Sequence, residues 1–475
     1  MAERWGRLEY CRQTTFLGDS AMSKQFRPWN PEQTYLFAPS PRDWLPENHL
    51  VYFLLDVVGQ LDLSAFLLPY QAQERGQPPF HPRMMVTLLL YGYATGTFSS
   101  RRLMSRCQSD VACRIIVGGD IPDFRTISDF RKLHLAALEG LFTEVLRLCA
   151  AAGLVKVGRI ALDGTKVKAN ASRHKAMSYD RMEQDEPRLK QEIADLLAQA
   201  EAADSQDDRT HGRDRHGEEL PAELARRESR LKKIQEAKAA LEAQAKTQAV
   251  AAEAQRLREG KPPSDKDPNL ALPEPKAQRN FTDPESKIMK TSNKGWDQCG
   301  NAQAVVNVHQ IILAADVTDE ANDKQQVQPM IEQVRHNVAI VGVKEKVKEM
   351  TADSGYYSEA NVAHLEGLGV DPYIATERLK HNEQMPPSPR GRCPGNLTAK
   401  QRMARKLRTK RGRAKYARRK GMIEPVFGQI KHGRGFRQFL LRGLKKMRAE
   451  WRLVSLTHNL LKLWRQEQIQ GQTQG

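Results

Sequence analysis

The chain lacks clustered cysteines and long apolar segments. Its six cysteines are scattered over 475 residues with no CxxC pair, which argues against a disulfide framework and against a zinc ribbon. The longest apolar run, Met84–Ala94, is too short to span a bilayer, and the N-terminus has no signal-peptide core. We therefore expect reduced thiols, a cytoplasmic location and no membrane partner.

Acidic residues are fewer than basic residues in this chain. The chain has 75 Lys and Arg against 57 Asp and Glu, a net charge of +18 and a mean hydropathy of −0.63. Such an excess favours a polyanionic partner, because each phosphate that is neutralised releases counterions. The alternative is a basic protein with no nucleic-acid role. Apolar residues make up 40% of the chain, which is enough for the cores of two or three domains.

The N-terminal third is expected to be helical. Residues 23–150 carry apolar side chains at helical spacing, for example in His81–Gly96. Residues 1–22 have the composition of a disordered extension, and the sequence leaves open whether translation starts at Met1 or Met22.

Two segments of this helical part have more specific features. Thr126 with Asp129 fits a capping box that would begin a helix running to about Gly153. Arg101 and Arg102 follow a core helix, and they either contact nucleic acid or form a plain exposed face.

After the helical part the pattern changes to strands. The segment Val155–Gly164 is β-like and ends in Asp-Gly. The later expected elements are two strands within 301–318 with a tight turn near 309–310, a helix over 323–336, a strand before Asp353, a helix over 358–369 and a strand over 371–376. Alternation of strands and helices predicts an α/β fold with a mixed sheet.

Residues 180–294 separate the first strand from the others. They are rich in Ala, Glu, Gln, Lys and Arg, with heptad-like apolar spacing over 224–245, a polar turn at 204–221 and a Pro-rich linker at 259–276. We expect an inserted α-helical hairpin, an antiparallel coiled coil. The hairpin either mediates dimerisation or is an insertion with no role in assembly.

The C-terminal part is strongly basic before its last helix. Lys400–Lys420 contains no acidic residue and leads directly to Glu424. It is either a solvated charged face or a phosphate-contacting surface, and its position before Glu424 favours the second. The last helix, expected over 440–463, has two apolar faces and is therefore predicted to be buried, with a disordered tail at 466–475.

Three acidic residues stand out by their order. Asp163 is predicted to end the first strand, Asp353 a later strand, and Glu424 lies on a helix with Lys431 seven residues on. Each has an alternative: an Asp-Gly hairpin turn, a turn before a helix, and a solvated glutamate. Together, carboxylates in basic surroundings suggest a site for two Mg²⁺ ions, which stabilise the attacking and leaving oxygens of phosphodiester chemistry.

These segments resemble the DDE transposases of bacterial insertion sequences. The resemblance spans residues 26–464 and is most specific in the glutamate block. The similar segments are "HPRMMVTLLLYGYATGTFSSRRL" with "IPDFRTISDFRK", "ALDGTKVKANAS", "TADSGYYSEANV", and "RRKGMIEPVFGQIKHGRGFRQFLLRG" with "HNLLKL".

The resemblance implies an InsH-like helical DNA-binding domain at 23–150 and a ribonuclease-H-like catalytic core made of 151–179 and 295–465. It implies two Mg²⁺ or Mn²⁺ ions bound by the acidic triad, and Lys431 in contact with DNA near the transposon end. The expected function is metal-dependent cleavage at the element's terminal inverted repeats and strand transfer into target DNA. The partners would be DNA and further copies of the chain, at least a dimer, associated with the nucleoid.

The basic residues expected to hold DNA phosphates, besides those already named, are Arg418, Arg419, Lys420 and Arg437. One departure concerns the Tyr-x2-Arg-x3-Glu-x6-Lys signature of related transposases. Here Tyr416 and Arg419 are followed by four residues before Glu424, one more than in that pattern.

A protein of another class is the alternative. A DNA-binding regulator with an inactive ribonuclease-H-like core would bind DNA without cleaving it, and the presence of all three acidic residues argues against it. A third possibility is a nuclease that hydrolyses DNA without strand transfer.

Overall fold

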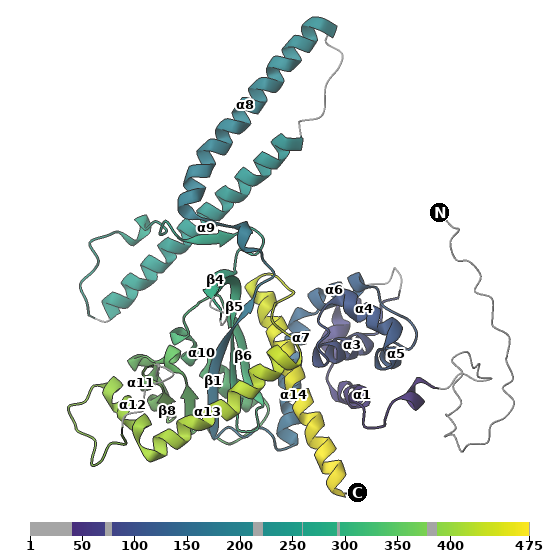
Figure 1. Cartoon of the computed structure of the whole chain (residues 1–475), viewed down its shortest axis with the longest axis vertical. Coiled ribbons are helices and arrows are strands. Elements are labelled where there is room, and N and C mark those ends of the chain that lie inside the picture. The colour runs from purple at the N-terminus through teal and green to yellow at the C-terminus, as the bar shows by residue number, and fades with distance from the viewer. Residues whose placement is uncertain are drawn as a thin grey trace, which may run out of the picture. The chain divides into compact units, whose positions relative to one another are not determined.

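The computed structural model of the chain describes residues 40–71, 78–211, 222–258, 260–291, 295–377 and 387–474 (Figure 1). The extension expected at 1–22 lies outside these ranges. Leu45–Gly475 forms one compact unit, and this unit contains the elements discussed below. The preceding unit, Met1–Trp44, contributes a 3₁₀ helix, Pro41–Trp44, to the described ranges.

The N-terminal part is helical, as predicted. Its helices are α1 (Leu50–Gln60), α2 (Ser64–Gln71), α3 (Pro82–Ala94), α4 (Ser100–Ser109), α5 (Val111–Val117), α6 (Phe124–Leu133) and α7 (Leu135–Ala151). Within the described part of the chain, no single helix is both long and apolar enough to span a membrane, and one pair bent by 75°, Leu50–Gln60 with Ser64–Tyr70, reaches those criteria only together.

The predicted capping box is wrong. Helix α6 begins directly after Asp123, whose side chain accepts a hydrogen bond from the Arg125 backbone N–H at 2.8 Å, so Thr126 and Asp129 lie inside the helix. The expected single helix is also two helices, α6 and α7. They are separated at His134, a buried residue whose ring packs against the aromatic side chains near it.

The main sheet is mixed and has six strands. They are β1 (Arg159–Lys168), β4 (Lys287–Lys290), β5 (Trp296–Asn307), β6 (Ile312–Thr318), β7 (Glu349–Ala352) and β8 (Asp371–Ile374). The order is β4-β5-β1-β7-β8, with β6 also paired to β5. The β1–β5, β4–β5 and β5–β6 pairs are antiparallel, and β1–β7 and β7–β8 are parallel. The predicted mixed α/β fold with a helical N-terminal region is confirmed.

The first strand is longer than predicted. It continues through Asp163 and Gly164 to Lys168, because every residue from Ile160 to Lys168 is paired with β5. Asp163 therefore lies in the middle of β1, and the prediction that Asp-Gly ends this strand is wrong. The two strands expected within 301–318 are confirmed as β5 and β6, with Gln310 at φ 63° in the turn between them.

The later helices are α10 (Val327–Ile340), α11 (Glu359–Gly367), α12 (Ala399–Arg408), α13 (Lys410–Gly428) and α14 (Leu444–Gln474), and a π-helical turn, Gln429–Gly433, follows α13. Helix α13 contacts β1, β5, β7 and β8, and it passes in front of β1 in Figure 1. Helix α14 contacts β6, α3 and α7, and so joins the sheet to the N-terminal helices.

Helix α14 is buried on two faces, as expected. The Trp451 indole N–H donates to the Gln303 carbonyl at 2.8 Å. The Asn459 side chain accepts from the Ile312 N–H at 2.8 Å and donates to the Ile312 carbonyl at 2.9 Å, so it pairs with β6 as a strand would. The helix continues to Gln474, so the disordered tail predicted at 466–475 is helical through Gln474. The Trp464 indole N–H donates to the Asn48 carbonyl at 3.3 Å near this end.

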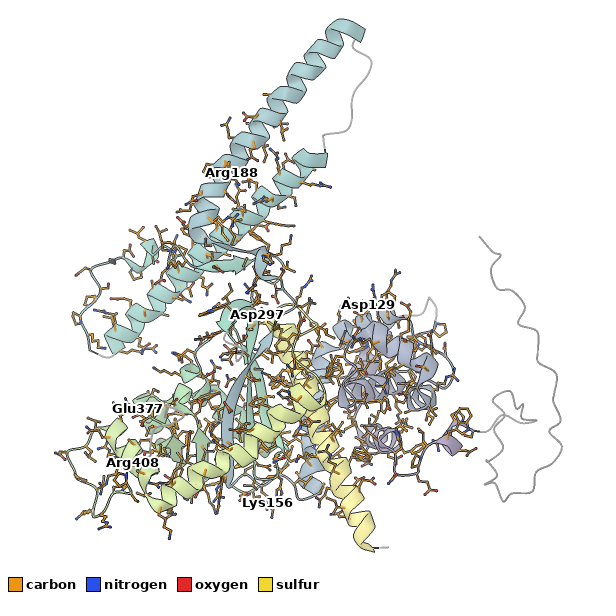
Figure 2. The ribbon with its side chains drawn as sticks, viewed as in Figure 1. Asp129, Lys156, Arg188, Asp297, Glu377 and Arg408 are labelled. Carbon is orange, nitrogen blue, oxygen red and sulfur yellow. The ribbon has the colours of Figure 1, made fainter. Side chains whose placement is uncertain are left out.

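The insertion contains two long helices, α8 (Tyr179–His211) and α9 (Ala222–Arg258), and residues 204–211 of the expected turn belong to α8. The helices run in opposite directions: Arg227 pairs with Glu192 at 3.1 Å, and Lys238, later in α9, pairs with Glu183, earlier in α8, at 3.6 Å. Arg188, labelled in Figure 2, is exposed and pairs within α8.

Two short strands, β2 (Ala176–Ser178) and β3 (Gln278–Asn280), pair where the chain enters and leaves the insertion. Strand β4 belongs to the main sheet although it lies within residues 180–294.

Candidate active site

Two of the three acidic residues are brought together by the parallel pairing of β1 and β7. The register pairs Ala161 with Thr351, and two residues further along each strand direction lie Asp163 and Asp353. Residues two apart on a strand point to the same face, and neighbouring strands are about 4.8 Å apart. The two carboxyl groups therefore occupy neighbouring positions on adjacent strands of the sheet.

The alternation of β1 separates two sets of side chains. Asp163 and Thr165 point to the face that α13 covers, since Arg419 and Lys431 contact them. Gly164 lies opposite Gln303 on β5, and their side-chain positions point to the other face. The structure thus places a charged site on one face of β1 and a polar layer on the other.

Arg419 is the closest cation to the first aspartate. Its Nη1 donates to Asp163 Oδ2 at 2.8 Å, and both side chains are largely buried. Burial raises the pKa of Asp163 to about 6, Arg419 opposes this shift, and the neighbouring carboxylate of Asp353 adds to it. A buried carboxylate beside a second carboxylate requires compensating positive charge, which Arg419 supplies here.

The departure from the family signature does not move Arg419 or Tyr416 away from the site. The Arg419 guanidinium lies 5.9 Å from the Tyr416 ring centre, and both Asp163 and Asp353 influence the Tyr416 hydroxyl, whose pKa is raised mainly by burial. Helix α13 thus places both residues near Asp163 despite the extra residue in the spacing.

Glu424 lies one turn further along α13, in an exposed position. Its carboxylate forms no hydrogen bond or ion pair with the residues that the structure describes. Within those residues, no three Asp, Glu, His or Cys side chains are grouped closely enough to hold a metal ion. The structure therefore unites Asp163 with Asp353 and leaves Glu424 on the adjoining helix.

Lys431 follows in the π-helical turn, an uncommon conformation that is frequent at functional sites. Its Nζ donates to the Thr165 hydroxyl and to the Lys166 carbonyl, the latter at 3.1 Å. Burial lowers the pKa of Lys431. The side chain predicted to contact DNA thus contacts β1 at Thr165, two residues beyond Asp163.

The other basic residues predicted to hold DNA differ in their surroundings. Arg418 and Lys420 are exposed on α13 on either side of Arg419, and Arg437 is exposed after the π-helical turn. Arg101 and Arg102 are exposed on α4, at the N-terminal helices, with the Arg101 guanidinium 4.7 Å from the Phe124 ring centre. The structure does not bring these two residues into contact with the acidic site.

Several polar residues next to the site escaped the sequence analysis. They are Asn301 and Gln303 on β5, Asp323 in the loop before α10, and Tyr356 after β7. The sequence does contain a pattern that could have indicated two of them. Asn301 and Gln303 alternate with alanines in a strand that is buried throughout this stretch. Polar side chains at every second position of a buried strand indicate a hydrogen-bonded layer.

Two family models match the chain. The Transposase domain (DUF772) matches residues 39–133, which include α1 to α6 of the N-terminal helices. The Transposase DDE domain matches residues 264–460, which include Asp353 and Glu424 but begin after Asp163. No curated protein and no solved structure matches the chain significantly. Neither family match supports the alternative of a regulator with an inactive core.

DDE transposases act on DNA, generally use divalent metal ions, and are polynucleotidyl transferases and endonucleases. The two matches lie in the same order as the two parts expected from the sequence. The chain belongs to the DDE transposases of insertion sequences, and its function is DNA transposition.

Proposed function

We propose that Asp163, Asp353 and Glu424 are the metal ligands of this transposase, and that they serve both cleavage at the element's ends and strand transfer. The observation that carries the proposal is the adjacency of Asp163 and Asp353 across β1 and β7, beneath the helix that bears Glu424. The sheet order supports a ribonuclease-H-like core: β1 has one antiparallel neighbour, β5, on one side and two parallel strands, β7 and β8, on the other.

The donor set suits Mg²⁺ or Mn²⁺, because these ions prefer oxygen ligands. Asp163 and Asp353 would hold them from the sheet and Glu424 from α13. When bound, two such ions neutralise charge on the attacking and leaving oxygens of the phosphodiester. The raised pKa of Asp163 fits this role, since a nearby cation would relieve the cost of its buried charge.

The chain's own cations would hold the DNA around this point. Arg418 and Lys420 face solvent beside Arg419 and are available to phosphates, as is Arg437 beyond Lys431. Lys431 itself would anchor β1 to the π-helical turn and present its charge next to the scissile strand. Arg101 and Arg102 on α4 would contact a second DNA segment, the terminal inverted repeat.

The proposed domain organisation follows the sequence analysis. We place the InsH-like DNA-binding domain at 23–150, the catalytic domain at 151–179 and 295–465 together with β4, and the inserted coiled-coil hairpin within 180–294. Joining two element ends in one complex requires at least a dimer, and the α8–α9 hairpin, which carries its own small apolar core, is a suitable dimerisation element.

The test is cleavage and strand transfer by the full chain on DNA that carries the element's own ends, with Mg²⁺ or Mn²⁺. Asp163→Asn and Asp353→Asn should each lower both activities by at least about a hundredfold while DNA binding persists. Asp319→Asn is the matched control, because Asp319 pairs with Lys287 at 2.7 Å and with neither Asp163 nor Asp353. Full activity in either site variant would refute the ligand assignment, and hydrolysis without strand transfer would reduce the enzyme to a nuclease.

A further inference from the structure

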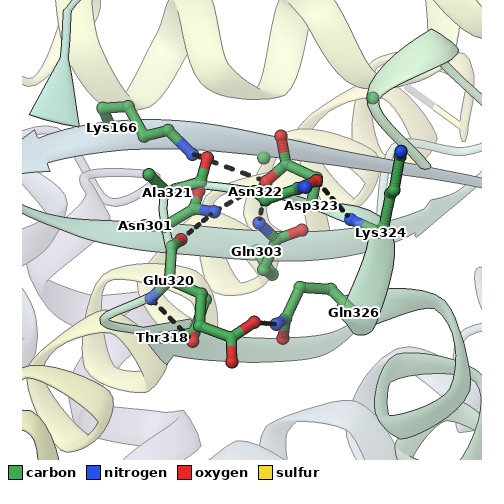
Figure 3. A network of polar contacts seen from close by, with 12 residues as sticks. Lys166, Asn301, Gln303, Thr318, Glu320, Ala321, Asn322, Asp323, Lys324 and Gln326 are labelled. Carbon is green, nitrogen blue, oxygen red and sulfur yellow. Dashed lines mark hydrogen bonds and ion pairs between the residues drawn. The ribbon is translucent and has the colours of Figure 1, made fainter. Parts of the chain in front are cut away.

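A polar network lies on the face of β1 opposite to Arg419 (Figure 3). Asp323 Oδ1 accepts hydrogen bonds from Asn301 Nδ2 at 2.6 Å and from Gln303 Nε2 at 2.9 Å, and Lys166 Nζ lies 3.5 Å away. One carboxylate oxygen of Asp323 therefore faces three donors from two neighbouring strands. Such an arrangement holds the loop before α10 firmly against β5 and β1.

The network reaches the second aspartate through Tyr356. The Tyr356 hydroxyl donates to Gln303 Oε1, and the ring is fully buried three residues after Asp353. Because Asp323 accepts from the amide nitrogen of Gln303, the amide oxygen is turned toward Tyr356. Asp323 thereby determines which end of the Gln303 amide the tyrosine meets.

The contact between Gln303 and Tyr356 requires a glycine at position 164, directly after Asp163. A Cβ at Gly164 would lie 2.5 Å from Gln303 Nε2 and 2.9 Å from the Tyr356 hydroxyl oxygen. No side chain fits there without displacing both groups. The Asp-Gly sequence in the middle of β1 is thus explained by the network rather than by a turn.

A second glycine, Gly355, lies close to both Asp353 and Asp323. The Gly355 N–H donates to Asp353 Oδ1 at 2.9 Å, and a Cβ at Gly355 would lie 3.1 Å from that oxygen and 3.4 Å from Asp323 Oδ2. The free oxygen of Asp323 therefore packs against the turn that orients the Asp353 carboxylate.

We propose that Asp323 and Tyr356 are positioning residues of the metal site, acting through Gln303 on the turn that carries Asp353. The inference rests on the proposed role of Asp163 and Asp353 as ligands. Neither positioning residue needs to touch metal or DNA. Groups that orient a metal ligand typically change metal affinity or activity by about 10- to 100-fold when they are removed.

The first test is Tyr356→Phe, which removes one hydroxyl and keeps the buried ring. Mn²⁺ binding to the full chain without DNA, followed by electron paramagnetic resonance, should weaken by about 10-fold or more. Cleavage at saturating Mn²⁺ should stay within about threefold of the parent, because only ligand orientation changes. Tyr357→Phe is the matched control, since the buried Tyr357 hydroxyl has no hydrogen-bond partner among the described residues.

The second test is Asp323→Ala against Asp319→Ala, each with its thermal midpoint measured. Asp323→Ala should shift the Mn²⁺ titration in the same direction as Tyr356→Phe, and Asp319→Ala should not. If Asp323→Ala fails to fold, Tyr356→Phe alone decides the question.

Two failures can be told apart. If Asp163→Asn and Asp353→Asn bind Mn²⁺ like the parent, the ligand assignment is wrong and the positioning role falls with it. If those two variants lose Mn²⁺ but Tyr356→Phe titrates like Tyr357→Phe, the ligand assignment stands and the positioning role is refuted.

Discussion

The Arg419 guanidinium donates to the Asp163 carboxylate, Nη1 to Oδ2 at 2.8 Å, across 256 positions of sequence. The Arg419 guanidinium compensates the negative charge of Asp163, as a bound metal ion would also do. The pair makes the charge state of Asp163 sensitive to pH, to Arg419 and to Asp353.

Metal affinity should depend on pH through Asp163. A metal ligand must be deprotonated, and burial raises the pKa of Asp163 to about 6, so the protonated form competes below that value. Without DNA, Mn²⁺ affinity should fall by about tenfold per pH unit below about pH 6 and level off above about pH 7. In Arg419→Gln the pKa should rise further, because the opposing cation is lost, and the midpoint should move to higher pH.

Arg418→Gln is the control for this titration. Arg418 is adjacent to Arg419 but exposed, and it pairs with no described residue. The same midpoint in both variants would contradict the coupling between Arg419 and Asp163. Isothermal titration calorimetry at several pH values gives the affinities directly.

Glu424→Gln should abolish cleavage without affecting the fold. The side chain is exposed and makes no hydrogen bond with described residues, so the thermal midpoint should change by less than about 1 °C. Cleavage with Mg²⁺ should fall by at least about a hundredfold. Glu366→Gln, at an exposed position of α11, is the control and should keep full activity. An active Glu424→Gln enzyme would remove the third ligand from the site.

Exposed cations of α13 should contribute to DNA binding in a salt-dependent way. The double variant Arg418→Gln, Lys420→Gln should bind DNA more weakly, and its slope of log affinity against log salt should shrink by about two. Fluorescence anisotropy over a range of KCl concentrations measures both quantities. The double variant Lys232→Gln, Lys233→Gln, on exposed positions of α9, is the control. An unchanged slope in the α13 variant would show that this surface does not bind phosphates.

Glu450→Ala should destabilise the link between α14 and the N-terminal helices. Glu450 is buried, accepts from the Tyr93 hydroxyl at 3.1 Å, and accepts from the Leu440 and Leu441 backbone N–H groups. Arg131, also buried, donates to the same tyrosine at 3.0 Å. Removal of the Glu450 carboxylate leaves the buried Arg131 guanidinium without a negative partner. The expected loss is about 3–5 kcal/mol of unfolding free energy.

The control for this change is Glu467→Ala, an exposed position on the same helix, with an expected loss below about 0.5 kcal/mol. Chemical denaturation of both variants at one pH compares them. Equal stability of the two would mean that the buried glutamate contributes nothing beyond its helical position.

Local patterns predicted much of the fold. Alternating and helical spacings located β5, β6, β7 and most helices, because burial of one face imposes a period on the sequence wherever an element forms. They failed at Asp163, since Asp-Gly is a favourable turn and only the pairing of β1 with β5 reveals that the strand continues. They failed again at Thr126, where Asp123 provides the cap instead.

The order of the acidic residues, the basic surroundings and the family resemblance are properties of the sequence by itself, and the family matches confirmed the resemblance. Three features depended on tertiary structure: the adjacency of Asp163 and Asp353, the pairing of Arg419 with Asp163, and the network that centres on Asp323. Local sequence determines backbone conformation and which face is apolar. Strand register and helix packing decide which side chains meet when they are hundreds of residues apart in the sequence. The local spacing of residues does not contain that information.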